Sequence, residues 1–193
     1  MTTLHPVILP LSPEAQCLRG RDRVQAQSLR AREALALSCE ASDVTLGPLR
    51  KDHRDAPLPF NGPTYWSLSH KTRYVAAVVG PTALGIDIEE ITPRNEALYG
   101  YLADEAEWSL AHNRGWEMFF RFWTAKEAVL KAVGIGLVHL SKVRIHAILD
   151  EENLLVDYDA RVWPVCHLRF QDHLVALMHD EHAVVWHRTP EER

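Results

Sequence analysis

Helix-forming residues dominate the first forty positions of the chain, and a long loop follows them. Ser12-Pro13-Glu14 offers a serine suited to an N-cap and a proline suited to the first helical turn. Good helix formers then fill residues 22–40. Residues 47–63 are rich in proline, glycine and charge, which predicts a loop long enough to be functional or mobile.

Three short strands are predicted next, at residues 64–69, 74–80 and 83–89. The middle strand carries the apolar run 75–79, and Gly80-Pro81 supplies the turn that follows it. Thr92-Pro93 then opens a mainly helical stretch, with one helix near residues 104–112 and a longer one at 116–133. Glycines at 134 and 136 predict the end of the longer helix.

Strand patterns dominate the C-terminal part of the chain. Apolar and polar residues alternate from 142 to 147, which gives a strand one apolar face. Further strands are predicted near residues 154–158, 162–170, 174–179 and 183–187. Pro164 indicates that its strand lies at an edge or carries a bulge. Strands and helices that cluster separately predict an α+β protein with antiparallel sheet.

Composition and charge narrow the class of protein. The chain has 193 residues, 47% of them hydrophobic, and a net charge of −5, so we expect no nucleic-acid partner, which would favour a basic domain. No apolar run is long enough for a membrane span, and no signal peptide is evident, so we expect no membrane partner. The odd, scattered cysteines (Cys17, Cys39 and Cys166) predict reduced thiols and a cytoplasmic location.

The strand Gly85-Ile86-Asp87-Ile88-Glu89 carries two carboxylates on one face. Ile86 and Ile88 would point into the core, while Asp87 and Glu89 stand side by side on the other face and Gly85 leaves room for a bulky neighbour. Adjacent carboxylates repel each other unless a cation or a proton lies between them. A solvated acidic face is the alternative interpretation.

The helix at 116–133 places a carboxylate among aromatic residues. At about 100° per residue, one stripe of this helix contains Trp116, Phe119, Phe120, Trp123, Glu127 and Leu130. Glu127 therefore falls where the core is predicted, with Lys131 one turn further along. Buried charges are paired or coordinate a metal. The alternative is an ordinary surface Glu–Lys pair, worth only about 0.2–0.5 kcal/mol.

Together, Asp87, Glu89 and Glu127 predict a site for a hard cation. Sites built from carboxylate oxygens suit Mg²⁺, whose remaining positions would go to water and substrate phosphates. Lys126 and Lys131 would then face the same phosphates. The chain contains no GxxxxGK[ST] sequence, so this would be a phosphoryl-transfer site without a P-loop.

The segment from Trp66 to Lys71 ends a strand with hydroxyls, an imidazole and an amine, all of which can bind phosphate. No GxSxG sequence surrounds its serines, so a hydrolase triad is not indicated.

Three motifs in this order give the chain a family resemblance. The motifs are Ser67-Leu-Ser-His70, Gly85-Ile-Asp-Ile-Glu89 and the helical segment from Trp123 to Lys131. Over roughly residues 64–140, the chain resembles the 4′-phosphopantetheinyl transferases of the larger, surfactin-synthetase-associated (Sfp-like) type. The resemblance implies a monomer of two similar α+β halves with antiparallel sheets, related by a pseudo-twofold, with the active site and coenzyme A between them. We place the halves at residues 1–98, with the coenzyme A phosphate contacts and the Asp/Glu strand, and 99–193, with the catalytic helix and C-terminal sheet.

The resemblance also implies roles for individual residues. The Mg²⁺ ligands would be Asp87, Glu89 and Glu127, and catalysis would depend on Glu127, Lys131 and Asp87. The residues expected to bind coenzyme A are Ser69, His70, Lys126, Lys131, Arg30 and Arg32, the two arginines standing for a group near the N-terminus that also includes Arg19, Arg21 and Arg23. Either Glu105 or Glu107 would support Lys131.

The activity implied is Mg²⁺-dependent transfer of phosphopantetheine from coenzyme A to a serine of an acyl or peptidyl carrier protein, releasing adenosine 3′,5′-bisphosphate. Carrier proteins are generally acidic, so Lys142 and Arg144 are candidates for the docking face. Two alternatives remain open: a Mg²⁺-dependent nucleotide pyrophosphate hydrolase, and a non-catalytic regulator that binds coenzyme A or a carrier protein. The chain has Asp55-Ala56-Pro57 where the family usually has Gly-Lys-Pro, and Ser67 in place of the motif asparagine.

Overall fold

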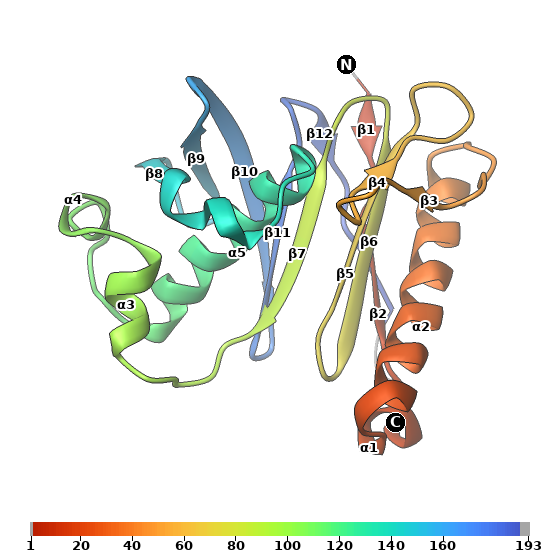
Figure 1. Ribbon diagram of the computed structural model, residues 1–193, viewed down its shortest axis with the longest axis horizontal. Coiled ribbons are helices and arrows are strands. Elements are labelled where there is room, and N and C mark those ends of the chain that lie inside the picture. The colour runs from red at the N-terminus through yellow and green to blue at the C-terminus, as the bar shows by residue number, and fades with distance from the viewer. Residues whose placement is uncertain (1, 190–193) are drawn as a thin grey trace.

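The computed structural model describes residues 2–189, apart from the side chains of residues 137 and 138. Its two main sheets pack against each other, and each carries one long helix on its outer face (Figure 1). The strand and helix content confirms the predicted α+β class with antiparallel sheets. The predicted pseudo-twofold relation between the halves stays a prediction.

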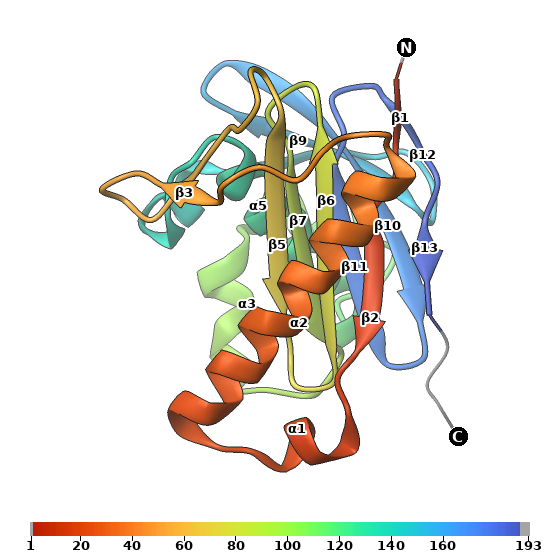
Figure 2. The same ribbon diagram turned by 90° about the vertical axis from the view of Figure 1, so that its right-hand side faces the viewer.

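The first main sheet has four strands in the order β13-β2-β6-β5. Their bounds are β2 Val7–Pro10, β5 Tyr65–His70, β6 Tyr74–Gly80 and β13 His187–Arg188. The helix α2 (Gly20–Ala41) covers the outer face of this sheet, as Figure 2 shows, and the short helix α1 (Pro13–Cys17) leads into it. The predicted loop at 47–63 contains a small two-stranded ladder, β3 (Arg50–Lys51) with β4 (Pro57–Leu58).

The second main sheet has five antiparallel strands in the order β7-β11-β10-β9-β8. Their bounds are β7 Gly85–Glu90, β8 Arg144–Ile148, β9 Asn153–Tyr158, β10 Arg161–Phe170 and β11 His173–Met178. The helix α5 (Trp116–Ala132) packs on its outer face, mainly over β7 and β11. Two short helices, α3 (Ala97–Leu102) and α4 (Glu105–Trp108), and the 3₁₀ helix η1 (Leu137–Lys142) flank α5. The helix predicted near 104–112 is therefore shorter than expected.

Alternation along the strands builds the interior in layers. On β6, Val75, Ala77 and Val79 face α2, whereas the residues between them face the second sheet. On β7, Ile86 and Ile88 are almost fully buried between the two sheets, which confirms the predicted orientation of this strand. The strand β6 thus contributes to two hydrophobic clusters because its side chains alternate between faces, whereas β7 contributes to one and carries Asp87 and Glu89 on its other face.

The two ends of the chain come together. The strand β1 (Thr3–Leu4) pairs in parallel with β12 (Ala183–Val184), and β2 pairs in parallel with β13. The strand β7 lies before the predicted boundary at residue 98, but its hydrogen-bonded partner β11 lies after it. Each main sheet therefore contains strands from both sides of that boundary.

The strand that carries Pro164 is not at an edge, which corrects the prediction, because β10 lies between β9 and β11 in the sheet. Pro164 pairs with Leu155 of β9 and lies one residue before the ladder with β11, which starts at Val165. Its carbonyl oxygen accepts a hydrogen bond from the His179 amide at 3.4 Å, and its missing amide hydrogen interrupts no paired position of the ladder with β11.

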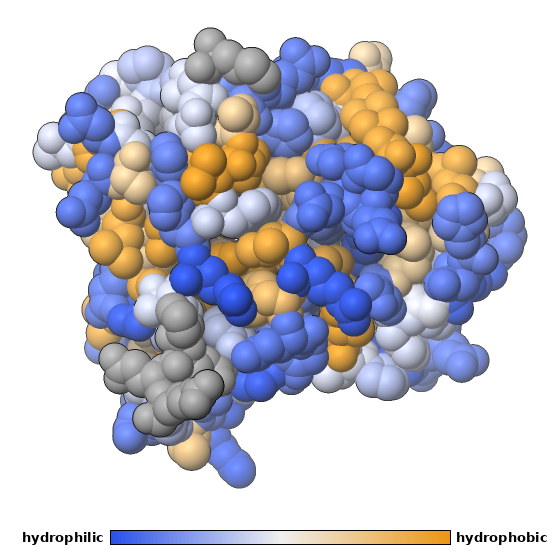
Figure 3. Space-filling model, turned by 180° about the vertical axis from the view of Figure 1, so that it is seen from behind, coloured by the Kyte–Doolittle hydropathy of each residue, from blue (hydrophilic) through white to orange (hydrophobic). Residues whose placement is uncertain are grey.

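The surface shows apolar side chains in separate patches. On the face opposite to that of Figure 1, hydrophilic residues lie between these patches (Figure 3). Among residues 2–189, no helix has both the length and the apolar character needed to cross a membrane.

Candidate active site

Four of the predicted site residues lie on β5 and β7 where these two strands meet: Ser69, His70, Asp87 and Glu89. No backbone ladder joins these two strands; side chains link them instead. The Ser67 hydroxyl accepts a hydrogen bond from the Ile86 amide at 3.1 Å, and the Ser69 hydroxyl donates to Asp87 Oδ1 at 2.9 Å. The first two motifs are thus brought into direct contact by tertiary structure.

Gly85 allows α5 to approach β7 closely. A Cβ atom at this position would lie 1.9 Å from the carbonyl oxygen of Ala128 and 2.7 Å from the amide nitrogen of Ala132. The bulky neighbour expected beside Gly85 is therefore the backbone of α5. This close approach brings the third motif, with Glu127 and Lys131, to the carboxylates of β7.

Lys131 is bonded directly to the acidic strand. Its ammonium group donates to Asp87 Oδ1 at 2.8 Å and to the carbonyl oxygen of Ile86 at 2.9 Å. Asp87 is 5% exposed, and its second oxygen, Oδ2, is buried with no hydrogen-bond partner. One oxygen of Asp87 thus remains available to a ligand.

The electrostatics show that the three carboxylates interact. Burial, together with the negative charges of Asp87 and Glu89, raises the pKa of Glu127 to about 7, although Lys131 opposes this shift. Burial also raises the pKa of Glu89, because it outweighs the ion pair that Glu89 forms with Lys71. An added cation would relieve this repulsion.

The carboxylates do not yet converge on one point. Glu89 is turned toward Lys71, and the described part of the chain contains no group of three or more His, Cys, Asp or Glu side chains placed to hold a metal ion. We call Asp87, Glu89 and Glu127 the acidic cluster. Its oxygens could form a common cation site only after Glu89 leaves Lys71.

His70 lies at the exposed end of β5, beside this cluster. Loss of hydration around its ring and the positive charges of Lys131 and Lys71 lower its pKa, while Asp87 opposes them. A mainly neutral imidazole therefore lies next to the lysine that contacts Asp87.

Lys126 does not join the acidic cluster, which corrects the prediction that it faces the phosphates. Its side chain is 1% exposed, and its ammonium group donates to the carbonyl oxygen of Leu102 and pairs with Glu107 Oε1, both at 2.7 Å. Glu107 also accepts a hydrogen bond from the Ile145 amide. Neighbouring residues of a helix point about 100° apart, so Glu127 faces β7 while Lys126 ties α5 to α4 and β8.

The expected acidic support for Lys131 comes from Asp87. Glu107 pairs with Lys126, and Glu105 pairs with Arg114 at the surface. Neither of the two acids proposed from the sequence contacts Lys131.

The two predicted arginines of α2 point in different directions. Arg30 donates to the carbonyl oxygen of Pro10 and pairs with Glu33, on the side of α2 that faces β2, two strands away from β5. Arg32 is exposed, and it points about 200° away from Arg30 because the two lie two positions apart along the helix. The structure therefore does not bring Arg30 to the acidic cluster.

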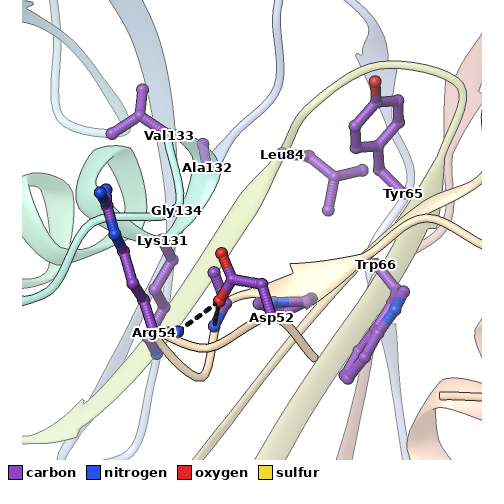
Figure 4. Close-up of a pocket in the computed structure, with 11 residues that line it drawn as sticks. Asp52, Arg54, Tyr65, Trp66, Leu84, Lys131, Ala132, Val133 and Gly134 are labelled. Atoms are coloured by element: carbon purple, nitrogen blue, oxygen red, sulfur yellow. Dashed lines mark hydrogen bonds between the residues drawn. The ribbon is translucent and has the colours of Figure 1, made fainter. Parts of the chain in front are cut away.

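A cavity of about 280 Å³ adjoins Lys131. Its walls come from the loop before β5, from Tyr65 and Trp66 of β5, and from the C-terminal end of α5 (Figure 4). The Asp52 carboxylate accepts hydrogen bonds from the amides of Arg54 and Ala56, which fixes the turn that carries Arg54 at the cavity. Sequence reasoning missed Arg54 as a residue of this region, although an aspartate two residues before it is a recognisable turn signal. For Lys71 the sequence indicated an affinity for phosphate, but not the ion pair with Glu89.

Of the two candidates for the docking face, Arg144 is paired with Asp104 at the surface, whereas Lys142 is exposed.

Comparison with known proteins agrees with these motifs. The family model of the 4′-phosphopantetheinyl transferase superfamily matches residues 83–184. A putative 4′-phosphopantetheinyl transferase of Haemophilus influenzae is 31% identical over 129 residues, which cover 59% of this chain and 54% of the relative. The 4′-phosphopantetheinyl transferase HetI of a Nostoc species is 30% identical over 143 residues, covering 67% of this chain and 60% of the relative.

A shorter match to 4′-phosphopantetheinyl transferase psf-1 of Bacillus pumilus is 36% identical over 77 residues, covering 38% of this chain and 33% of the relative. The chain thus spans little more than half the length of the first two relatives. The family model covers more than half of this chain and includes both β7 and α5, the elements that carry the acidic cluster. By these matches, the chain belongs to the 4′-phosphopantetheinyl transferase superfamily.

Proposed function

We propose that this protein transfers the 4′-phosphopantetheine group from coenzyme A to a serine of a carrier protein in a Mg²⁺-dependent reaction. The observation that carries the proposal is the meeting of Asp87, Glu127 and Lys131 beside Ser69. The first three of these residues lie within the part of the chain that the family model matches. A buried site with several carboxylates and a lysine suits the charge of a pyrophosphate and a hard cation.

The chemistry of the cluster fits Mg²⁺. All its donors are carboxylate oxygens, Asp87 Oδ2 is buried without a hydrogen-bond partner, and burial together with the charge of Asp87 raises the pKa of Glu89 and of Glu127. Asp87 and Glu127 would hold the ion, joined by Glu89 once it leaves Lys71. When bound, Mg²⁺ supplies neutralisation of pyrophosphate charge.

The residues around the cluster would bind and orient coenzyme A. Lys131, already beside Asp87, would contact the transferring phosphate and stabilise the charge that develops there. Ser69 and His70 would contact pyrophosphate oxygens from the end of β5. Arg54 would add a positive charge in the adjoining cavity, on the segment where the usual Gly-Lys-Pro is absent.

In the reaction, the carrier serine oxygen forms a bond to the β-phosphorus of coenzyme A. The bond between that phosphorus and the bridging oxygen breaks, and adenosine 3′,5′-bisphosphate leaves with the electron pair. Glu127 would accept the serine proton as general base.

The test is intact-mass spectrometry of apo-carrier proteins incubated with the protein, coenzyme A and Mg²⁺. We expect a mass gain of one phosphopantetheine that disappears with EDTA. Glu127→Gln and Asp87→Asn should slow the transfer by roughly 10²- to 10⁴-fold while the fold survives. Glu117→Gln, at an exposed position of the same helix, is the matched control and should retain activity.

Other outcomes would identify the alternatives. Cleavage of coenzyme A without a carrier would favour the hydrolase. Tight binding of coenzyme A without transfer to any carrier would favour the regulator. Near-normal transfer by both cluster variants would refute the assigned roles.

A further inference from the structure

Two ammonium groups already neutralise the acidic cluster. Lys131 contacts Asp87, as described above, and Lys71 forms an ion pair with Glu89 Oε2. The side chains of Lys71 and Glu89 are only 27% and 15% exposed, so this pair is less screened by water than a surface pair. Lys71 belongs to none of the three motifs, and the sequence offered no role for it beyond phosphate affinity.

Lys71 is held firmly at its backbone. It directly follows β5, at the start of the turn to β6, where its amide donates to the Tyr74 carbonyl oxygen at 2.8 Å. Its own carbonyl oxygen accepts a hydrogen bond from Gln27 Nε2 of α2 at 3.0 Å. The flexible side chain therefore reaches from a fixed point on the first sheet to Glu89 on the second.

The ion pair holds the Glu89 carboxylate at Lys71, and no three acidic or metal-ligating side chains of the described residues are placed together to hold a cation. A metal ion that enters alone must displace the Lys71 ammonium group from Glu89, which leaves that group without a counter-ion. A pyrophosphate that enters with the metal brings negative oxygens for the displaced group. The two ligands should therefore bind more favourably together than separately.

Resting on the proposed function, we propose that Lys71 is an exchangeable counter-ion that pairs with Glu89 in the empty site and with pyrophosphate oxygens in the loaded site. Lys71 thereby competes with the divalent cation for Glu89 and couples cation binding to coenzyme A binding. It acts as a positioning residue toward Glu89 and as a binding residue toward the pyrophosphate.

The experiment compares wild type with Lys71→Met, which keeps the apolar stem of the side chain and removes its charge. The affinity for Mn²⁺, used as a paramagnetic probe of the cation site, is measured by electron paramagnetic resonance with and without coenzyme A. Without coenzyme A, we expect Lys71→Met to bind Mn²⁺ roughly two- to tenfold more tightly, because the competing ammonium group is gone. The enhancement of Mn²⁺ affinity by coenzyme A should fall by roughly fivefold or more.

Two further variants separate this role from a structural one. Lys71→Arg retains a cation and should keep most of the coupling. Lys51 forms an ion pair with the exposed Asp55, away from the acidic cluster. Lys51→Met should therefore leave the Mn²⁺ affinity unchanged, both with and without coenzyme A. A merely structural role for Lys71 would lower the melting temperature without tightening Mn²⁺ binding.

Failure of this proposal can be told from failure of the proposed function. Suppose that wild type transfers phosphopantetheine normally, but Lys71→Met binds Mn²⁺ no more tightly than wild type and coenzyme A still enhances its Mn²⁺ affinity. The role of Lys71 is then refuted, and the proposed function stands. If wild type binds neither Mn²⁺ nor coenzyme A, both proposals fall.

Discussion

Lys126 and Glu127 are sequence neighbours whose charges serve different parts of the molecule. Glu127 faces β7 and the acidic cluster, whereas Lys126 is buried against Glu107 and the Leu102 carbonyl oxygen. Removing one partner of such a buried pair leaves an uncompensated charge, at a cost of about 3–5 kcal/mol. At the scale of single residues, burial therefore indicates which charged side chains matter to the fold or to the site. The residue that each side chain contacts then shows which of the two it serves.

His167 is a second buried ionisable residue, and its burial predicts that the folded protein loses stability in acid. Its ring is fully buried between the carbonyl oxygens of Glu152 and Arg121, and loss of hydration lowers its pKa from 6.5 to about 4. The unfolded chain takes up the proton first, so stability should fall as pH drops from 6.5 to 4, by at most about 3 kcal/mol.

Urea denaturation of wild type and His167→Gln at pH 7.5 and pH 5 measures this contribution. The variant should lose less stability than wild type on acidification. His146→Gln, at an exposed position of β8, serves as the control and should follow wild type. Parallel losses in wild type and His167→Gln would contradict the prediction.

At the scale of elements, the approach of α5 to β7 creates the candidate site. Glycine at position 85 permits that approach, since a side chain there would meet the helix backbone. We expect Gly85→Ala to destabilise the fold by about 1–3 kcal/mol or more, because backbone atoms cannot move aside as a flexible side chain can. The same shift of α5 should displace Glu127 and Lys131 and lower any transfer activity.

Gly100→Ala is the matched control for this substitution. Gly100 lies within α3, with no atom within 4 Å of the added methyl group, so alanine should stabilise the helix by about 0.5–1 kcal/mol. Chemical denaturation of both variants should thus give changes of opposite sign in the free energy of unfolding. An unchanged free energy of unfolding for Gly85→Ala would show that the fold does not depend on the close contact between α5 and β7.

At the scale of the whole molecule, the C-terminal strands join the two ends of the chain. The strands β12 and β13 pair with β1 and β2, and Val184 and Trp186 pack against the cluster between the main sheets. Ending the chain after Glu181 should lower the melting temperature on the order of 10 °C, since it removes both the pairing and this apolar burial. A chain that ends after Thr189 keeps both strands and should melt as the full chain does; equal melting of the two truncated chains would contradict the role of β12 and β13.

Local patterns predicted most of the elements well. The strands β5, β6 and β7 and the helix α5 begin and end within about two residues of the expected positions, because alternation and helix-ending glycines are local signals. The short strands β1 to β4 were not predicted. Each has only two to four residues, too few to set a period. The strands β1 and β2 are defined by pairing with distant segments, and β3 and β4 by pairing with each other.

The sequence by itself determined the α+β class, the three motifs, the alternation that buries Ile86 and Ile88, and the family resemblance. Tertiary structure alone decided that Ser69 contacts Asp87, that Lys126 pairs with Glu107, and that Lys71 reaches Glu89. The physical reason is that periodicity fixes the face on which a residue lies, whereas the partner of a charge depends on which elements the hydrophobic core brings together. Those contacts join residues far apart in the chain, and no local pattern contains them.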